Sequence, residues 1–462
     1  MSDPASAPRR TVTSFVAGSL LILAALAAPW LAGAQTTLPN VRWWLGGALA
    51  AAFFVVVFGR LAARRLVGIS PWAGLGALFL LGCLGVWATR PEPNFSTLFG
   101  DEHWKFLNEH YPRALFQLPR LERLGFFACI ILGFLAAIDL GRRETFRRQL
   151  TFAIGLSGMG VALYALGFDR LGFPALPWTL IDDGTERLNV CFAHYSGPAA
   201  CLNLAWPLLA FGVVERFAWI RRVIPVLLVT AALPLWDSAA AKAIPVGLLI
   251  AGAGWRWGET RGWFTPGLLR TALGLALVAV FSWQTFSVWQ MRAPSPDGWI
   301  SSEKTLEDAP VFDAELRTLA EKRGDHLLPS NAPGRQSAWL CAARMAADSP
   351  LIGLGPGAWV KRSALYSRDP AVNTFSHYRQ YAHHDLLQFA AEWGGLAALA
   401  ALFLFAGGIW QAMQRHPADI GIVLALVGVA LHSTVDFPLQ NPALQIWTAL
   451  LLGLTWSQVR RK

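Results

Sequence analysis

The sequence predicts an all-α polytopic membrane protein with about twelve transmembrane helices. Of its 462 residues, 54% are hydrophobic and only 15% are charged, whereas about a quarter of the residues in a soluble protein are charged. Apolar windows of roughly 17–25 residues recur along the chain, and an α-helix needs this length to cross a bilayer. Arginine clusters between the windows set their orientation.

Twelve apolar windows are candidate spans, and they divide the chain into three parts. Residues 1–289 hold nine spans, residues 290–384 form a long polar loop with short helices, and residues 385–462 hold the last three spans. The two windows on either side of Asp237 are short and interrupted by proline, so they are the weakest of the set. The windows are 14–34, 43–58, 71–88, 124–140, 150–167, 195–214, 219–236, 239–256, 268–289, 385–411, 418–435 and 443–458.

Every basic cluster falls on the same side of these windows. By the positive-inside rule that side is the cytoplasm, which therefore holds both termini, and the loops 89–123, 168–193 and 290–384 face outward. The net charge of +10 thus reflects membrane orientation, and we expect no nucleic-acid partner. We expect a multi-pass membrane protein. The clusters contain Arg9, Arg10, Arg60, Arg64, Arg65, Arg142, Arg143, Arg147, Arg148, Arg216, Arg221, Arg222, Arg256, Arg261, Arg415, Arg460, Arg461 and Lys462.

The long outer loop contains a glycine-rich motif at Gly353–Ala358. It has the GxGxxA spacing of a dinucleotide site, but that site requires a preceding strand and a βαβ unit. A turn is strongly favoured here. We expect it to end a helix over residues 335–348 and to reverse the chain.

That helix has two interpretations. Ala338, Trp339 and Ala342 share one side at helical spacing, as in an amphipathic helix on the bilayer surface with Arg335 reaching the headgroups. Alternatively, Arg335 binds a diphosphate, because a guanidinium suits bidentate phosphate binding. The spacing alone favours the first interpretation.

His383, His384 and Asp385 lie where the long loop enters the tenth window. The spacing matches no standard zinc pattern, even with His377 as a further ligand, so we expect no metal. A histidine at a membrane–water boundary suits proton transfer, because its pKa lies near working pH. A purely structural interfacial histidine is an equal alternative.

Two further polar segments lie near the outer face. His432 and Asp436 are four residues apart, so we expect an orienting pair on one helical face. Glu392, in the tenth window, is expected to be buried and partnered. Arg187 and His194 precede the sixth window. Arg187 and Arg335 would bring two guanidinium groups to one membrane face, enough to neutralise a diphosphate.

Together these motifs resemble the core of the O-antigen ligase and polymerase superfamily, over roughly residues 185–440. His384 stands where the family commonly has Asn. His194 stands where the family has a further Asn. The family often has a Ser-Arg pair where this chain reads Asp237–Lys242, so Lys242 is a candidate to replace that arginine. The resemblance rests on Arg187–Ser196, Arg335, Trp339, Ser349–Gly357, Ala382–Gly394 and His432–Phe437.

The resemblance implies a metal-independent membrane glycosyltransferase without a cofactor. It would transfer a glycan from a polyprenyl diphosphate carrier to a hydroxyl of a glycolipid or polysaccharide acceptor, at the periplasmic face. Arg187 and Arg335 would stabilise the departing diphosphate, and His383 would take the acceptor's proton or orient its hydroxyl. The expected substrate-binding residues are His384, Lys242, Gln388, His432, Asp436 and His194.

Three alternatives stay open. A polymerase of the same superfamily would add repeat units to a lipid-linked chain, and a protein O-oligosaccharyltransferase would glycosylate Ser or Thr side chains. A lipid-linked glycan transporter belongs to a different class. Few charged residues within the spans, and no repeat between the two halves, argue against the transporter.

Overall fold

The computed structural model describes eleven helices that resemble membrane spans. Six are long and apolar enough to cross a membrane and five are shorter apolar helices, so the protein is a polytopic helical membrane protein. Within the described parts of the chain there is no strand. The described residues are 12–31, 41–89, 120–174, 176, 192, 196–212, 218–232, 235, 239–260, 334–363, 366, 381–414 and 419–457.

These helices coincide with eleven of the twelve predicted windows, and the window 268–289 lies outside the described residues. The total of twelve spans therefore stays a prediction. The long helices are α1 (Val12–Leu31), α2 (Val41–Ala62), α3 (Pro71–Thr89), α6 (Arg120–Leu140), α7 (Glu144–Leu171) and α19 (Gly395–Met413). The shorter ones are α8 (Ser196–Ala210), α9 (Ala218–Ala232), α10 (Ala239–Thr260), α20 (Ile420–Ser433) and α21 (Pro442–Trp456).

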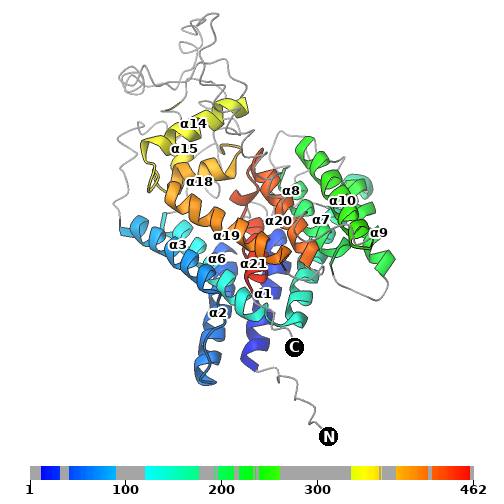
Figure 1. Cartoon of the computed structure of the whole chain (residues 1–462). Helices are drawn as coiled ribbons and strands as arrows, with labels where there is room; N and C mark the ends of the chain where they lie inside the picture. The colour runs from blue at the N-terminus through cyan, green and yellow to red at the C-terminus, as the bar shows by residue number, and fades with distance from the viewer. Residues whose placement is uncertain are drawn as a thin grey trace, which may run out of the picture.

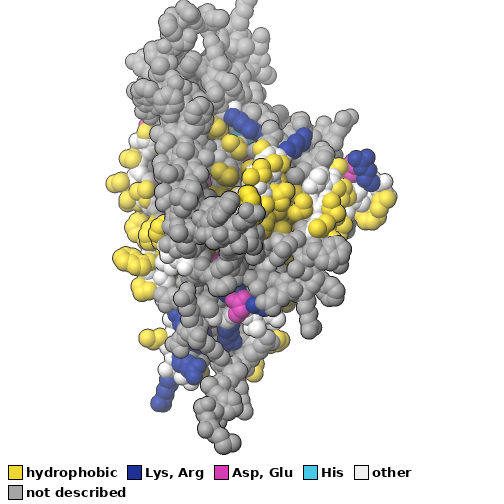
Figure 2. All heavy atoms as spheres, turned by 45° about the vertical axis from the view of Figure 1, so that its right-hand side comes forward, with side chains coloured by type: hydrophobic (Ala, Val, Ile, Leu, Met, Phe, Trp, Pro, Cys, Tyr) yellow, Lys and Arg dark blue, Asp and Glu magenta, His cyan; other side chains and the backbone are white. Residues whose placement is uncertain are grey.

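The helices form a bundle with the last helix near its centre (Figure 1). α21 packs against α1, α6, α19, α20 and α7. Its Trp447 is fully buried and donates a hydrogen bond to the Ala25 carbonyl of α1 at 2.7 Å. Hydrophobic side chains cover the described middle of the molecule in Figure 2, as expected for a surface in contact with lipid.

Three short helices lie together at the upper end of the bundle in Figure 1: α14 (Gly334–Asp348), α15 (Ala358–Arg362) and α18 (Asp385–Trp393). α14 was predicted over residues 335–348, and that prediction is confirmed. The turn after it is also confirmed, because Gly353 N–H bonds to the Ser349 carbonyl at 2.9 Å. No strand precedes Gly353 in the described part of the loop, which agrees with a turn and not a dinucleotide site.

The start of α1 and the end of α21 lie at the opposite end of the bundle. A side chain on Gly59 of α2 would meet Thr13 of α1, and beside it Arg60 forms an ion pair with Asp139 of α6 at 2.7 Å. Arg147 also lies at this end, so we call it the Arg147 end. We call the end with α14, α15 and α18 the His383 end. Arg60, at the end of α2, and Arg147 and Arg148, at the start of α7, lie at the Arg147 end, and dark blue side chains gather at this lower end in Figure 2.

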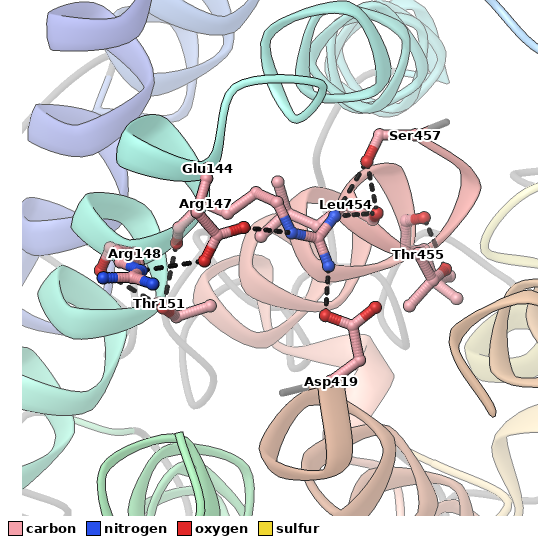
Figure 3. A network of polar contacts seen from close by, with 9 residues as sticks. Glu144, Arg147, Arg148, Thr151, Asp419, Leu454, Thr455 and Ser457 are labelled. Carbon is pink, nitrogen blue, oxygen red and sulfur yellow. Dashed lines mark hydrogen bonds and ion pairs between the residues drawn. The ribbon is translucent and has the colours of Figure 1, made fainter. Parts of the chain in front are cut away.

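Arg147 holds three helices together at this end (Figure 3). Its guanidinium, buried on α7, donates to Asp419 at the start of α20. It also donates to the Leu454 carbonyl at 2.6 Å and to Ser457 Oγ at 2.8 Å, at the end of α21. The sequence placed Arg147 in a loop before the window 150–167, but α7 begins at Glu144 and includes it.

The predicted single span over 385–411 is wrong. The structure has two helices, α18 and α19, separated by Gly394 with φ of 89°. The turn after α14 packs against the break, where Gly395 N–H bonds to the Pro350 carbonyl at 2.7 Å. A Cβ at Gly394 would lie 2.3 Å from the Leu351 carbonyl oxygen. Glycine satisfies both demands, because it accepts positive φ and lets two backbones approach closely.

Candidate functional site

The candidate site begins at His383, in the loop before α18. His383 is fully buried and has φ of 52°, a left-handed conformation that is uncommon for residues other than glycine. Trp339 Nε1 of α14 donates to its carbonyl at 2.9 Å. The adjacent Ala382 N–H donates to Gln388 Oε1 at 3.0 Å. A strained backbone held on both sides suggests that the position of this side chain matters to function.

Asp436 joins the two buried histidines of the site. Its Oδ1 lies 3.1 Å from His383 Nδ1, and its Oδ2 lies 3.8 Å from His432 Nε2. Burial alone would raise the pKa of Asp436, but hydrogen bonds and positive charge from the two histidines hold it well below its usual value. Asp436 is therefore a carboxylate that can orient an imidazole and stabilise its protonated form. The predicted contact between His432 and Asp436 is confirmed.

Aromatic rings cover this histidine–carboxylate pair. The Phe437 ring meets the His383 ring edge-on at 4.7 Å between centroids. Phe437 also stacks with Tyr381 at 4.0 Å between centroids. The rings keep His383 and Asp436 in a largely apolar environment, where electrostatic interactions are stronger than in water.

His384 caps the N-terminus of α18. Its Nδ1 accepts a hydrogen bond from Leu387 N–H at 3.3 Å, so the nitrogen must be unprotonated. Burial lowers the pKa of His384 to about 4, which keeps the ring neutral. Asn is a favoured N-cap residue, so the histidine does here what the family's common Asn could do. Its assignment to substrate binding stays a prediction.

Asp385 ties α18 to the segment that follows Asp436. Its carboxylate accepts from Leu439 N–H at 2.8 Å and from Gln440 Nε2 at 3.2 Å. Both donors lie in or beside the short helix η6 (Pro438–Gln440). Burial raises the pKa of Asp385 to about 7. Asp385 is not among the site residues predicted from the sequence, although its position directly after two histidines was a signal.

Gln388 and Glu392 connect α18 to the glycine-rich turn. Gln388 Nε2 donates to Glu392 Oε1 at 3.3 Å, and Glu392 accepts from the N–H groups of Gly357 and Trp359 at 3.0 and 3.2 Å. The prediction that Glu392 is buried and partnered is confirmed. Both polar ends of Gln388 are bonded to protein, and its assignment to substrate binding stays a prediction.

α14 carries Arg335 toward the same loop. The helix packs on α15 and α18 through Ala338, Cys341, Ala342 and Met345, which are buried. The predicted apolar side is therefore covered largely by protein, so the interpretation of α14 as a helix resting on the bilayer surface is wrong. Arg335 is half-buried and lies one turn before Trp339, which contacts the His383 carbonyl.

For three other predicted residues, a role at this site stays a prediction. Lys242 is exposed on α10, and whether it replaces the family's arginine stays a prediction. Arg187 and His194 lie outside the described residues, so the meeting of Arg187 with Arg335 stays a prediction too. Among the described residues, no group of three or more His, Cys, Asp or Glu side chains is arranged to hold a metal ion.

Residues 200–402 match the family model described as O-antigen ligase. This match supports assigning the chain to the O-antigen ligase superfamily. It runs from within α8 into the first half of α19, and it includes Arg335, His383 and the whole of α18. No curated protein matches the chain significantly. The assignment indicates a membrane enzyme that transfers glycosyl groups in the manner of O-antigen ligases and polymerases, with lipid-linked glycans or polysaccharides as substrates.

Proposed function

We propose that this protein transfers a glycan from a polyprenyl diphosphate-linked donor to an acceptor hydroxyl, as an O-antigen ligase does, at the periplasmic face of the inner membrane. The observation that carries the proposal is the buried pair of His383 and Asp436, 3.1 Å apart, at the end of the bundle opposite Arg147. A histidine oriented by a buried carboxylate is suited to accept a proton from a hydroxyl.

In the proposed reaction the acceptor oxygen attacks the anomeric carbon of the donor glycan. The bond between that carbon and the diphosphate oxygen breaks, and the diphosphate leaves with the electron pair. The acceptor's proton passes to His383 Nε2, since Nδ1 faces Asp436. Asp436 then stabilises the imidazolium that forms, as a carboxylate does in other histidine-based sites. No redox step or external energy source is required.

Arg335 would offset the charge that develops on the leaving diphosphate. A guanidinium stays charged and can bind two phosphate oxygens at once. Its helix is anchored through Trp339 to the loop that contains His383, which supports a fixed position of Arg335 relative to His383. Arg187 would act beside it, and Lys242, His432 and His194 would contact the glycan or its carrier.

The test uses the purified full chain in detergent, with a lipid-linked glycan donor and a hydroxyl acceptor. Arg335→Ala and His383→Ala should abolish transfer, whereas Arg65→Ala, an exposed arginine at the Arg147 end, should leave it unchanged. Unchanged transfer by Arg335→Ala and His383→Ala would refute the proposal. If the wild type makes no product but moves the donor across vesicle membranes, the protein is a transporter.

Mass analysis of surface glycans from a deletion strain separates the ligase from the polymerase. If the protein is a ligase, the deletion strain accumulates lipid-linked polymer, and its acceptor lacks long glycan chains. A polymerase leaves single repeat units instead. Loss of glycan from Ser or Thr residues of proteins would indicate an oligosaccharyltransferase.

A further inference from the structure

Two arginines from the N-terminal helices lie close to the loop that contains His383. Arg42 is in the first turn of α2 and Arg123 in the first turns of α6, and both helices begin at the His383 end. Neither residue falls within the segment that matches the O-antigen ligase family. The proposed function does not use them.

The structure packs Arg123 directly on the glycine-rich turn. A Cβ at Gly357 would lie 2.2 Å from Arg123 Nη1, so the absence of a side chain there makes room for the guanidinium. Gly357 has φ of 77°, which also favours glycine. Its N–H bonds to Glu392, and the turn is therefore fixed to α18 while it supports the arginine.

Arg42 and Arg123 both lie near the aromatic cover of His383. Their positive charges act on the hydroxyl of Tyr381, whose pKa is raised by burial and lowered by these two groups. Tyr381 stacks on Phe437, which touches the His383 ring. Two ring contacts thus connect Tyr381 to the proposed base.

The arrangement concentrates positive charge. α2 packs against α6, with Trp43, next to Arg42, in contact with Gly125, two residues after Arg123, and the first turn of α2 contains no acidic residue. Cations at a helix N-terminus also oppose the helix dipole. Glu122 and Glu392 offset part of this charge, but burial raises the pKa of Glu392 and so disfavours its charged form. An anion beside the arginines would relieve the repulsion.

The surroundings of the pair indicate a ligand that comes from the membrane. Trp43 and Trp44 follow Arg42 and are 44% and 62% exposed, as expected for tryptophans in the interfacial belt of a membrane helix. The Trp43 ring lies over Gly125 of α6, whose Cβ would be 2.8 Å from it. Both arginines are half-buried, so each side chain keeps part of its surface accessible.

We propose that Arg42 and Arg123 form a binding site for the phosphoryl headgroup of a lipid, with its hydrocarbon chain along Trp43 and Trp44 and its headgroup beside the Gly357 turn and Tyr381. The proposal rests on the proposed function only in that a lipid held there lies next to His383. Donor and acceptor lipids both carry the required chemistry when they are phosphorylated.

The test measures binding before activity. The purified full chain in detergent is titrated with geranylgeranyl diphosphate, with phosphatidic acid, with the uncharged alcohol geranylgeraniol and with inorganic diphosphate. Arg42→Ala and Arg123→Ala should each weaken binding of at least one phosphorylated lipid about tenfold or more, because each removes charge-assisted hydrogen bonds. Binding of geranylgeraniol should not change.

Two sets of controls keep the result interpretable. Arg65→Ala removes an exposed arginine from the Arg147 end and should bind like the wild type. Arg42→Lys and Arg123→Lys keep the charge and should fold normally, yet bind less tightly than the wild type, because an ammonium lacks the planar fork of a guanidinium. Size-exclusion chromatography reports folding for every variant.

The outcomes separate this site from the proposed function. Binding of both phosphorylated lipids that is unaffected by the alanine variants overturns the site, and so does binding of inorganic diphosphate as tight as that of the lipids. A loss of lipid binding in a protein with no transferase activity supports the site and overturns the proposed function. In an active protein, a raised KM for the donor alone assigns the site to the donor, and a raised KM for the acceptor alone assigns it to the acceptor.

Discussion

The two ends of the helix bundle use buried charge in different ways. At the Arg147 end, one guanidinium donates to a carboxylate, a carbonyl and a hydroxyl, so the charge is fully bonded within the protein. At the His383 end, one carboxylate serves two histidines, and one of these histidines has a strained backbone. The first arrangement is suited to hold helices together, and the second to accept a proton. Substitutions at the two ends should therefore affect different properties.

The largest effect is expected at the His383 end. His383→Ala removes the proposed base, and Asp436→Asn removes the negative charge that orients and stabilises it. Each should lower the rate of glycan transfer by about 10²–10⁴-fold, while the thermal unfolding temperature changes little in comparison. Transfer by Asp436→Asn at the wild-type rate would show that Asp436 does not act on His383.

Arg147→Ala should have the opposite profile. It leaves Asp419 buried without its cation, and breaking such a pair costs about 3–5 kcal/mol of the free energy of unfolding. The protein that remains folded should transfer glycan at the wild-type rate per molecule, since the network is far from His383. Arg148→Ala is the matched control: its partner Glu144 is half exposed, so it should cost less than about 1 kcal/mol. Equal destabilisation by both variants would contradict a special role for Arg147.

A smaller effect concerns pH at the start of α18. The pKa of His384 is lowered from 6.5 to about 4, so its contribution to stability is complete above pH 6.5 and is lost as the pH falls toward 4. The pKa of Asp385 is raised from 3.8 to about 7, so its contribution is complete below pH 3.8 and is lost as the pH rises to 7. The two effects oppose each other in the wild type.

Replacing His384 or Asp385 should reveal the pH dependence of stability that the other residue contributes. His384→Asn keeps an N-cap but removes the histidine titration, so between pH 7 and 5 it should gain about 2 kcal/mol relative to the wild type. Asp385→Asn should show the reverse trend. Thermal unfolding measured at several pH values checks both, and parallel curves for wild type and His384→Asn would contradict the prediction.

The smallest effect isolates the strain at His383. Both His383→Gly and His383→Ala lose the side chain, but only glycine tolerates φ of 52° without cost. His383→Gly should therefore be more stable than His383→Ala by about 1 kcal/mol. Denaturation of the two variants in the same detergent provides the comparison, and equal stability would show that the loop relaxes.

The sequence predicted well what depends on neighbouring residues. Apolar windows located eleven helices, and the four-residue spacing of His432 and Asp436 predicted their contact. It could not predict pairs formed by distant segments. Arg147 and Asp419 are 272 residues apart, and each alone resembles an ordinary loop charge. Arg42 and Arg123 were passed over for the same reason.

The break at Gly394 illustrates a further limit. The residues on both sides are apolar and form helices readily, so the pattern indicated one continuous span. The break depends on hydrogen bonds that Gly395 and Leu396 donate to the carbonyls of Pro350 and Leu351, about 40 residues earlier. Similarly, the buried side of α14 has the pattern of a bilayer-surface helix, and only the packing of α15 and α18 shows that protein covers it.

The break at Gly394 also separates the site around His383 from changes of tilt that the bilayer imposes on α19. A continuous rod would transmit each change of tilt from the bilayer to its outer tip, whereas a glycine joint lets α19 lean without carrying α18 along. Helices adjust to thinner or thicker bilayers mainly by tilting. We therefore expect turnover in vesicles to vary little with acyl-chain length, although thermal stability varies, and a steep dependence of turnover on chain length would show that the joint is rigid.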